Sequence, residues 1–190
     1  MHIALFGGSF DPPHIGHQLV ANALIEHALV DEVWFVPVFK HPWAKSMNKV
    51  KLAPYATRLK MLKQIIGPSQ KIAEFKKTSF TYDTFAYFEN KHPDWAFTWV
   101  MGSEYIPKFN NFLKDHPQLI TKPFYVYPRE GHSFEGAYSN MTTLKKFPTV
   151  KASSTQVREL ISSEKSVSKL VNPQVEKIIK DENLYKNTPQ

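Results

Sequence analysis

Two histidines and three glycines are concentrated in residues 7–17, Gly-Gly-Ser-Phe-Asp-Pro-Pro-His-Ile-Gly-His. An apolar run precedes them and an amphipathic stretch follows, which predicts a strand, a glycine turn and a helix. Glycine lets the backbone approach an anion closely, and a helix N-terminus offers unpaired N–H groups at the positive end of its dipole. His14 and His17 lie three residues apart at the helix entrance and are expected to project to the same side. The stretch therefore predicts a phosphate-binding site.

Each of these features also has an ordinary structural interpretation. A Gly-Gly turn after a strand is common, and a histidine near a helix start is usually a cap or a surface residue, an interpretation that stays open for His14. Three of the seven glycines of the chain fall in this one stretch, which favours a functional role. Neither G-x-x-x-x-G-K-[ST] nor G-x-G-x-x-G occurs, so the P-loop and the dinucleotide fingerprint are excluded.

Length and composition indicate one globular domain. The chain has 190 residues, of which 42% are hydrophobic and 14% aromatic, as expected for a packed core. Its longest apolar runs are too short to span a bilayer and no secretory signal is visible. It has no cysteine, which excludes thiolate chemistry and is compatible with a cytoplasmic protein. The formal charge of +7 suits an anionic partner, either nucleic acid or a nucleoside triphosphate.

Strand and helix signals alternate along the chain, which predicts an α/β fold. We expect a Rossmann-like, doubly wound parallel sheet of five to six strands with helices on both faces. Strands are expected at residues 3–6, 32–36, 71–75, 96–101, 124–127 and 149–150. Helices are expected near residues 18–28, 54–66, 82–90, 105–113, 155–161 and 173–179. Ser79 or Thr81 is expected to cap the third helix, and residues 38–51 and 131–146 are expected to be loops.

The helix after the glycine turn is expected to bury one apolar face, formed by Leu19, Val20, Ala23, Leu24 and Ala28. In open parallel sheets, ligands bind at the carboxyl ends of the strands. The segments that follow five of the expected strands should therefore meet in one crevice. They are residues 7–17, 40–45, 102–104, 128–131 and 153–158.

Residues 7–17 resemble the signature of the nucleotidylyltransferase superfamily that carries the HxGH motif. Within it, the stretch is most similar to bacterial nicotinate-nucleotide adenylyltransferases, and weaker similarity extends to the last helix. The resemblance implies transfer of AMP from ATP to the 5′-phosphate of nicotinate mononucleotide, which forms deamido-NAD and pyrophosphate in NAD biosynthesis. It implies direct in-line attack, and one domain over residues 1–190 with a small C-terminal helical part at about 153–186.

The resemblance assigns ATP to segments from both ends of the chain. His14 and His17 would contact the triphosphate, with His17 stabilising the transition state. The other ATP-binding positions that it implies are Gly8, Ser9, Phe10, Gly102, Glu104, Ser153, Ser154, Thr155 and Arg158. Mg²⁺ would be carried by ATP, because no cluster of carboxylates in the sequence suggests a protein metal site.

These ATP-binding segments have different physical roles. Ser9 and Phe10 would offer backbone N–H groups to phosphate, and residues 102–104 would border the adenosine. Arg158 follows Thr155 by three residues in a Ser-Ser-Thr-x-x-Arg motif, so both can face one anion at a helix N-terminus. Taken alone, a Ser-Ser-Thr cluster is more often plain helix capping.

The acceptor side is implied to involve Lys45, Ser79, Thr81 and Phe112. Lys45 resembles the cation that ends the family's phosphate-contacting loop, and residues 79–81 resemble a Ser-Tyr-Thr segment beside the pyridine ring. Phe112 stands where a tryptophan commonly stacks on that ring, Glu104 replaces an aspartate, and residues 38–45 differ from the usual loop. Two of these three departures concern the acceptor, so nicotinamide mononucleotide and phosphopantetheine stay open as acceptors.

Two other classes of function compete with catalysis. One is a non-catalytic nucleotide-binding protein, which would need affinity without contacts to a transition state. The other is a nucleic-acid binder, which is disfavoured because no recognised nucleic-acid motif is present. We therefore expect ATP and a pyridine mononucleotide as partners, with no nucleic acid and no membrane; a homo-oligomer stays open. Arg58 and Arg129 are weaker site candidates, and Arg58 can equally be interpreted as a solvated helix residue.

Overall fold

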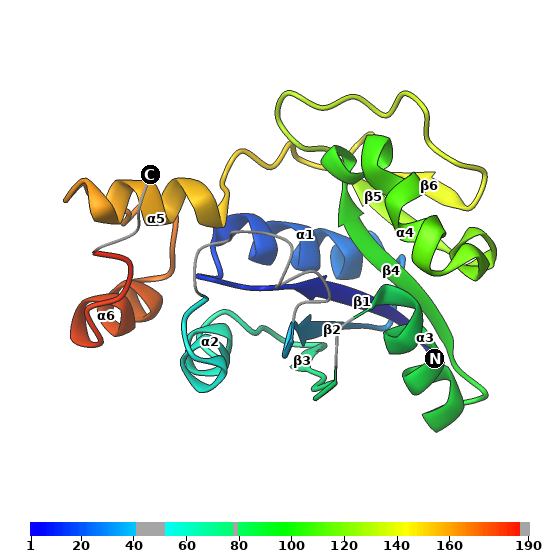
Figure 1. Ribbon diagram of the computed structural model, residues 1–190, viewed down its shortest axis with the longest axis horizontal. Helices are drawn as coiled ribbons and strands as arrows, with labels where there is room; N and C mark the ends of the chain where they lie inside the picture. Colours follow the sequence, from blue (N-terminus) through cyan, green and yellow to red (C-terminus); the bar gives the residue numbers. More distant parts are fainter. Residues whose placement is uncertain (41–51, 78–79, 187–190) are drawn as a thin grey trace.

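The chain forms one six-stranded parallel sheet (Figure 1). A computed structural model describes residues 1–40, 52–77 and 80–186. The strand order is β3-β2-β1-β4-β5-β6, and every neighbouring pair is parallel. The strands are β1 (His2–Gly8), β2 (Glu32–Pro37), β3 (Gln70–Ile72), β4 (Ala96–Gly102), β5 (Phe124–Tyr127) and β6 (Met141–Thr143). The chain reverses its direction of winding between β1 and β4, so their carboxyl ends border a topological switch point.

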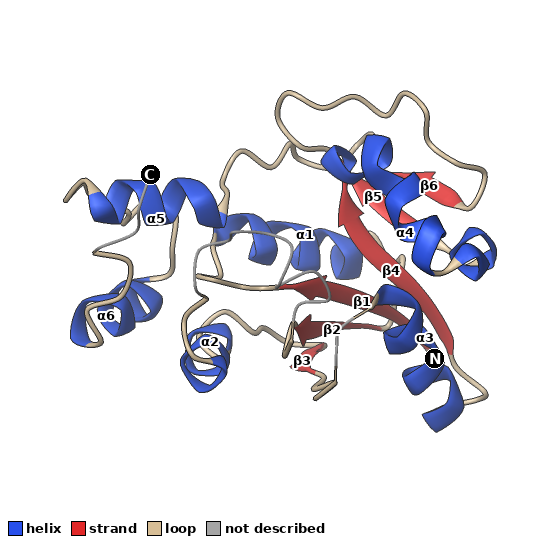
Figure 2. Cartoon of the chain, viewed as in Figure 1, coloured by secondary structure: helices blue, strands red, loops and turns tan. Residues whose placement is uncertain are grey.

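Helices cover both faces of the sheet (Figure 2). The α1 face is covered by α1 (Ile15–Glu26), α2 (Tyr55–Leu62), α5 (Ser154–Ser162) and α6 (Pro173–Asp181). The α3 face is covered by α3 (Thr81–Lys91), the 3₁₀ helix η1 (Ser103–Lys108), α4 (Phe109–Asp115) and the 3₁₀ helix η2 (Pro117–Thr121). This arrangement confirms the expected doubly wound α/β fold. No helix in the described part of the chain is long and apolar enough to cross a membrane.

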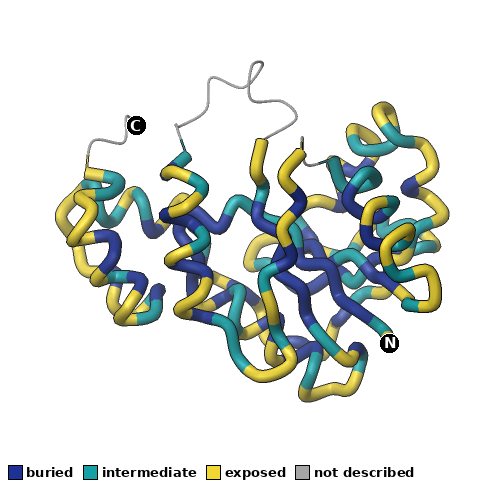
Figure 3. The backbone as a smooth tube through the Cα atoms, turned by 90° about the horizontal axis from the view of Figure 1, so that it is seen from below, coloured by how far each residue is buried: buried dark blue, intermediate teal, exposed yellow. Residues whose placement is uncertain are grey.

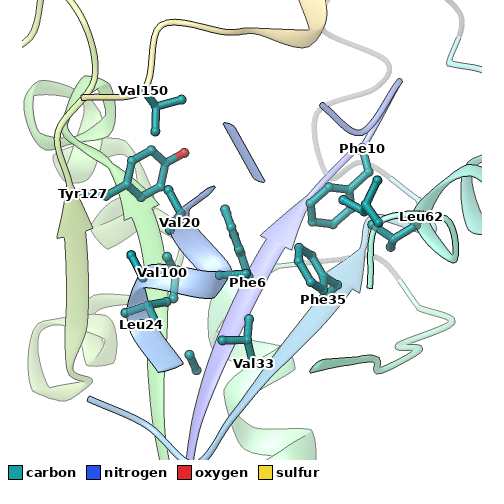
Figure 4. Packing of buried hydrophobic residues seen from close by; sticks show 14 of the residues in the cluster. Phe6, Phe10, Val20, Leu24, Val33, Phe35, Leu62, Val100, Tyr127 and Val150 are labelled. Atoms are coloured by element: carbon teal, nitrogen blue, oxygen red, sulfur yellow. The ribbon is translucent and has the colours of Figure 1, made fainter. Parts of the chain in front are cut away.

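The central strands are buried on both sides, as continuous apolar runs require. In β1, Ala4 and Phe6 pack on the α1 face, whereas Ile3 and Leu5 pack on the α3 face. Figure 4 shows part of the α1-face cluster. Phe6 lies between Phe10 and Phe35 on one side and residues of α1 and β5 on the other, which are Val20, Leu24 and Tyr127. Among the described residues, the buried ones are concentrated around these strands, while the outer faces of the helices are exposed (Figure 3).

The sixth strand differs from the sequence prediction. It is β6 (Met141–Thr143), inside the stretch expected to be an irregular loop, and it pairs with Phe124–Val126 of β5. The expected strand at 149–150 is reduced to one isolated bridge between Val150 and Arg129. An edge strand of three residues is too short to show a period, so its pairing depends on β5 rather than on its own sequence.

Two helices also depart from expectation. Helix α1 ends at Glu26, Leu19 is 40% exposed, and Ala28 lies beyond the helix with a φ of 50°. The expected helix over 105–113 is split into η1 and α4, and Pro107 lies within η1. Proline lacks the N–H that a continuous α-helix needs, which explains the split. Among the described residues, no side chain caps helix α3 by a hydrogen bond. Its N-cap is Phe80, Thr81 is its first residue, and Ser79 lies outside the described residues.

Candidate active site

The histidine pair lies where β1 leads into α1. His14 is the N-cap of α1 and its Nδ1 accepts the Gly16 N–H at 3.1 Å. The His14 backbone N–H in turn donates to Nδ1 of His17 at 3.1 Å, and the two ring centroids are 3.8 Å apart. A backbone N–H can only donate, so each Nδ1 must be an acceptor and each neutral ring carries its proton on Nε2. The capping and functional interpretations of His14 are thus compatible, because the cap leaves Nε2–H as a donor.

Burial and a neighbouring cation keep both rings neutral. His14 is only 5% exposed, and burial together with the Arg129 charge lowers its pKa to about 3. Burial also lowers the pKa of His17 well below its ordinary value, reinforced by His14 and Arg129. A phosphate group bound in front of the rings would oppose both effects, since an adjacent negative charge favours the protonated imidazole.

Gly16 allows the helix entrance to pack closely. A Cβ at Gly16 would lie 2.5 Å from Cγ1 of Val150 and 3.0 Å from the His14 ring. Because Val150 belongs to the segment that leads into α5, this contact brings the N-terminal turn and the C-terminal helices together. The glycine is therefore required by packing at this position.

Polar residues from the ends of β4 and β5 form a second part of the site. Nε of Arg129 lies 3.3 Å from Oε1 of Glu104, and its Nη1 donates to the Ala152 carbonyl at 2.6 Å. A Cβ at Gly102 would overlap the Glu104 carboxylate, so glycine leaves space for this carboxylate to fold back on the strand end. Oε2 of Glu104 is buried and has no hydrogen-bond partner among the described residues. It is an acceptor that a ligand hydroxyl can satisfy.

The N-terminus of α5 is attached to the same turn that follows β1. Ser153 is the N-cap and its side chain accepts the Gln156 N–H at 3.1 Å. Ser154 donates from its hydroxyl to the Pro12 carbonyl at 2.8 Å, across 142 residues of sequence. The capping interpretation therefore holds for Ser153, while Ser154 joins the two ends of the chain.

Arg158 lies one turn further along α5. Its Nη1 donates to the Asp11 carbonyl at 2.7 Å and its Nη2 to Oγ1 of Thr155 at 3.1 Å. Its Nε is buried without a hydrogen-bond partner among the described residues. A buried guanidinium N–H without a partner is costly, so this donor is a second position that a ligand oxygen can satisfy.

The turn between β1 and α1 contains two backbone N–H groups without an acceptor among the described residues. Phe10 has a φ of 49°, and its ring is buried against Phe6, Phe35 and His17. The N–H groups of Ser9 and Phe10 donate to no other described residue. Gly8 ends β1, and its carbonyl accepts the Val38 N–H at 2.9 Å. These N–H groups are therefore free to bind an anion, and phosphate binding by Ser9 and Phe10 stays a prediction.

Arg58 is not a solvated helix residue. It is 2% exposed and donates to the carbonyls of Ser9, Val38 and Ala53. The helical spacing to Met61, Leu62 and Ile65, all buried, is the sequence signal that could have placed Arg58 on the inner face. For Arg129, the signal was its position directly after a strand end.

The expected acceptor residues lie on the α3 face or outside the described residues. Thr81 begins α3 and is half-buried. Phe112, on α4, is half-buried, with its ring 6.1 Å from those of Tyr105 and Phe109. Lys45 and Ser79 fall in segments that are not described. The structure thus brings together His14, His17, Gly102, Glu104, Arg129 and the α5 N-terminus, whereas Thr81 and Phe112 belong to α3 and α4, which cover the other face of the sheet.

Comparisons with known proteins give consistent findings. Residues 5–160 match the cytidylyltransferase-like family model. The chain is 34% identical over 196 residues to a probable nicotinate-nucleotide adenylyltransferase of Cytophaga hutchinsonii, covering 98% of this chain and 100% of that one. A protein of the same name from Halalkalibacterium halodurans is 34% identical over 191 residues, covering 97% and 91%. The structure of Plasmodium falciparum nicotinic acid mononucleotide adenylyltransferase complexed with NaAD has the same fold, with a TM-score of 0.82, 19% identity and 97% coverage of each chain.

Proposed function

The chain belongs to the cytidylyltransferase-like family, among the nicotinate-nucleotide adenylyltransferases, and we propose that it makes deamido-NAD. In this reaction, AMP is transferred from ATP to the 5′-phosphate of nicotinate mononucleotide and pyrophosphate is released. The two curated relatives share a third of their residues with this chain over nearly its whole length. Their common name supports a role in NAD biosynthesis.

One observation carries the proposal: the paired imidazoles with their protons on Nε2. The rings lie 3.8 Å apart, both Nδ1 atoms are occupied by backbone N–H groups, and Arg129 lies close enough to lower both pKa values. Two fixed neutral donors beside a guanidinium suit the oxygens of a polyphosphate. Because the donors are positioned before the ligand binds, they need not reorganise as charge develops.

The reaction needs positioning and charge neutralisation rather than a covalent intermediate. An oxygen of the acceptor's 5′-phosphate attacks the α-phosphorus of ATP and forms the new P–O bond. The bond from the α-phosphorus to the α–β bridging oxygen breaks, and its electron pair leaves with pyrophosphate. His17 donates its Nε2–H to the oxygens on which charge builds up, and His14 assists it from the adjacent ring.

The remaining ATP contacts come from the strand ends and from α5. The N–H groups of Ser9 and Phe10, next to Gly8, bind phosphate oxygens. Arg158 and the N-terminus of α5 bind phosphate from the opposite side, and Glu104, at the Gly102 turn, accepts a hydrogen bond from a ribose hydroxyl. The residues at the start of α5 that are proposed to bind ATP are Ser153, Ser154, Thr155 and Arg158.

Mg²⁺ would be carried by ATP, where it would neutralise part of the negative charge of the phosphates. Among the described residues there is no group of three or more histidine, cysteine, aspartate or glutamate side chains that could hold a metal ion. The nearby Glu104 carboxylate lies against Arg129. This donor set suits an ion that is held mainly by phosphate oxygens.

The acceptor is proposed to bind through Lys45, Ser79, Thr81 and Phe112. Residues 1–190 are proposed to act as one cytoplasmic domain, in which the helical part at about 153–186 contributes α5. A homo-oligomer remains compatible with this proposal, and no role for nucleic acid is included.

The proposal is tested by measuring pyrophosphate release from ATP with nicotinate mononucleotide, nicotinamide mononucleotide or phosphopantetheine in separate reactions. We expect the nicotinate compound to give the highest kcat/KM, with deamido-NAD identified by chromatography. A higher kcat/KM with another acceptor would show that this acceptor is the substrate, while adenylyl transfer from ATP would stand as the reaction. ATP binding without pyrophosphate release from any acceptor would instead identify a non-catalytic nucleotide-binding protein.

A further inference from the structure

Arg58 is a buried cation whose three donor groups reach three separate segments. Nη1 donates to the Ser9 carbonyl at 2.7 Å, in the turn after β1. Nη2 donates to the Val38 carbonyl at 2.8 Å, just after β2, and Nε donates to the Ala53 carbonyl at 3.1 Å, just before α2. None of these contacts takes part in the proposed reaction.

The charge of Arg58 is compensated by Asp11, which is equally buried. Asp11 is 1% exposed, and its carboxylate accepts the Ala53 N–H at 3.3 Å and the hydroxyl of Tyr185. Burial lowers the pKa of Arg58, and the Asp11 charge opposes that effect. Arg58 and Asp11 thus hold the carbonyl and the N–H of the same residue, Ala53, from two directions.

A buried charge is expensive and contributes little net stability compared with apolar packing. Three backbone carbonyls from distant segments can be fixed by one planar guanidinium, whose donors diverge in a rigid fork. Ser9 is in the turn whose N–H groups are proposed to bind phosphate. Arg58 is therefore the side chain that joins the carbonyls of this turn, of the end of β2 and of the start of α2, in addition to the Val38–Gly8 and Ala53–Asp11 hydrogen bonds.

We propose that Arg58 is a positioning residue for phosphoryl transfer, which holds the Ser9–Phe10 turn at a fixed distance from the ends of β2 and α2. The proposal rests on the proposed function, because the turn is taken to bind ATP. Arg58 acts through the backbone of Ser9 and does not touch substrate. Its loss shifts the phosphate-binding N–H groups without removing them.

The test compares Arg58→Lys and Arg58→Gln with Thr57→Val. Lysine keeps the charge but cannot reach three diverging carbonyls, and glutamine removes the charge. Thr57 is the matched control: it is the neighbouring buried residue on α2, and its hydroxyl donates to Glu182 at 2.8 Å instead of to the turn. For each variant, kcat, KM for ATP, Kd for a non-hydrolysable ATP analogue and Tm are measured at a temperature where circular dichroism shows folded protein.

We expect Arg58→Lys to lower kcat about tenfold and Arg58→Gln about a hundredfold, as for small misplacements of reacting groups, with weaker binding of the analogue in both. Thr57→Val is expected to lower Tm while keeping the wild-type kcat and Kd. Wild-type kcat and Kd in both folded Arg58 variants would overturn the proposal, as would failure of both to fold while Thr57→Val folds. If the wild-type protein releases no pyrophosphate, the proposed function fails and the analogue Kd alone decides the role of Arg58.

Discussion

The α1 face and the α3 face of the sheet hold their proposed ligand-binding residues in different ways. On the α1 face, directed hydrogen bonds join segments that are far apart in sequence, such as Arg158 to Asp11 and Ser154 to Pro12. On the α3 face, the contacts of Phe112 and of Tyr82, the residue after Thr81, are aromatic. The ring of Tyr82 stacks on His116 at 5.3 Å, and Phe112 packs beside Tyr105 and Phe109.

This difference suggests a division of labour. Hydrogen bonds are directional and fix donors to a fraction of an ångström, whereas aromatic packing tolerates several geometries at similar free energy. In-line transfer at the α-phosphorus requires the first kind of precision. Recognition of a flat acceptor ring can use the second. We therefore expect changes on the α1 face to affect turnover and changes on the α3 face to affect the acceptor.

The largest effect is expected from His17→Ala. Removing one preorganised donor at the reacting phosphate should lower kcat by about a hundredfold or more. The matched control is His27→Ala, which changes an exposed histidine at the opposite end of α1. Turnover is measured as pyrophosphate release at saturating ATP and acceptor. Near-normal kcat in the His17 variant would break the assignment of catalysis to the α1 face.

Arg158→Gln is expected to have the next largest effect. A hydrogen bond to a charged group is worth about 1.5–3 kcal/mol, so KM for ATP should rise roughly tenfold to a hundredfold. KM for the acceptor serves as an internal control and should change little. A rise in the acceptor KM of the same size would show that the two faces are not functionally separate.

Acid should destabilise the α1 face through its histidines. The pKa of His14 is about 3 in the folded protein and near 6.5 when unfolded. The unfolded state therefore binds more protons between these values. The contribution of neutral His14 to the free energy of unfolding is fully present above pH 6.5 and is lost as the pH falls towards 3. Between these two pKa values, His14 contributes a slope of about 1.4 kcal/mol per pH unit. Chemical denaturation at a series of pH values measures this slope, and an undiminished slope in His14→Gln would contradict it.

Phe112→Ala should give the smallest change. An aromatic contact beyond simple burial is worth about 0.5–1.5 kcal/mol, so the acceptor KM should rise by about twofold to tenfold. KM for ATP should stay at its wild-type value. The comparison is sharpened by Phe112→Trp, which supplies a larger ring for stacking and should not raise the acceptor KM. An equal effect of Phe112→Ala on both substrates would place this ring outside the acceptor site.

The parts of the fold that were predictable from sequence depend on local signals. The strand, glycine turn and helix around His14 are encoded within residues 3–26, and Ser153 caps its own helix. The alternation of strands and helices was sufficient to predict the doubly wound sheet. These features need no knowledge of distant partners, because capping and periodicity act within one or two turns of chain.

The parts that were not predictable depend on distant partners. The three-residue strand β6 exists because β5 presents an edge to it. Arginine is a charged residue type that is typical of protein surfaces, but the carbonyl partners of Arg58 come from positions 9, 38 and 53. The pairing of Arg129 with Glu104 likewise joins the ends of two strands. No local pattern specifies such contacts, so a three-dimensional structure was needed to place these side chains.

We propose that AMP passes directly from ATP to the acceptor phosphate in front of the histidine pair. The most direct test uses ATP radiolabelled at the α-phosphorus, mixed with the protein and nicotinate mononucleotide and followed through a single turnover. We predict that the label appears only in deamido-NAD as pyrophosphate forms, and that the protein stays unlabelled with or without acceptor. Label bound covalently to the protein, or label that remains in ATP while the acceptor is present, would contradict the account.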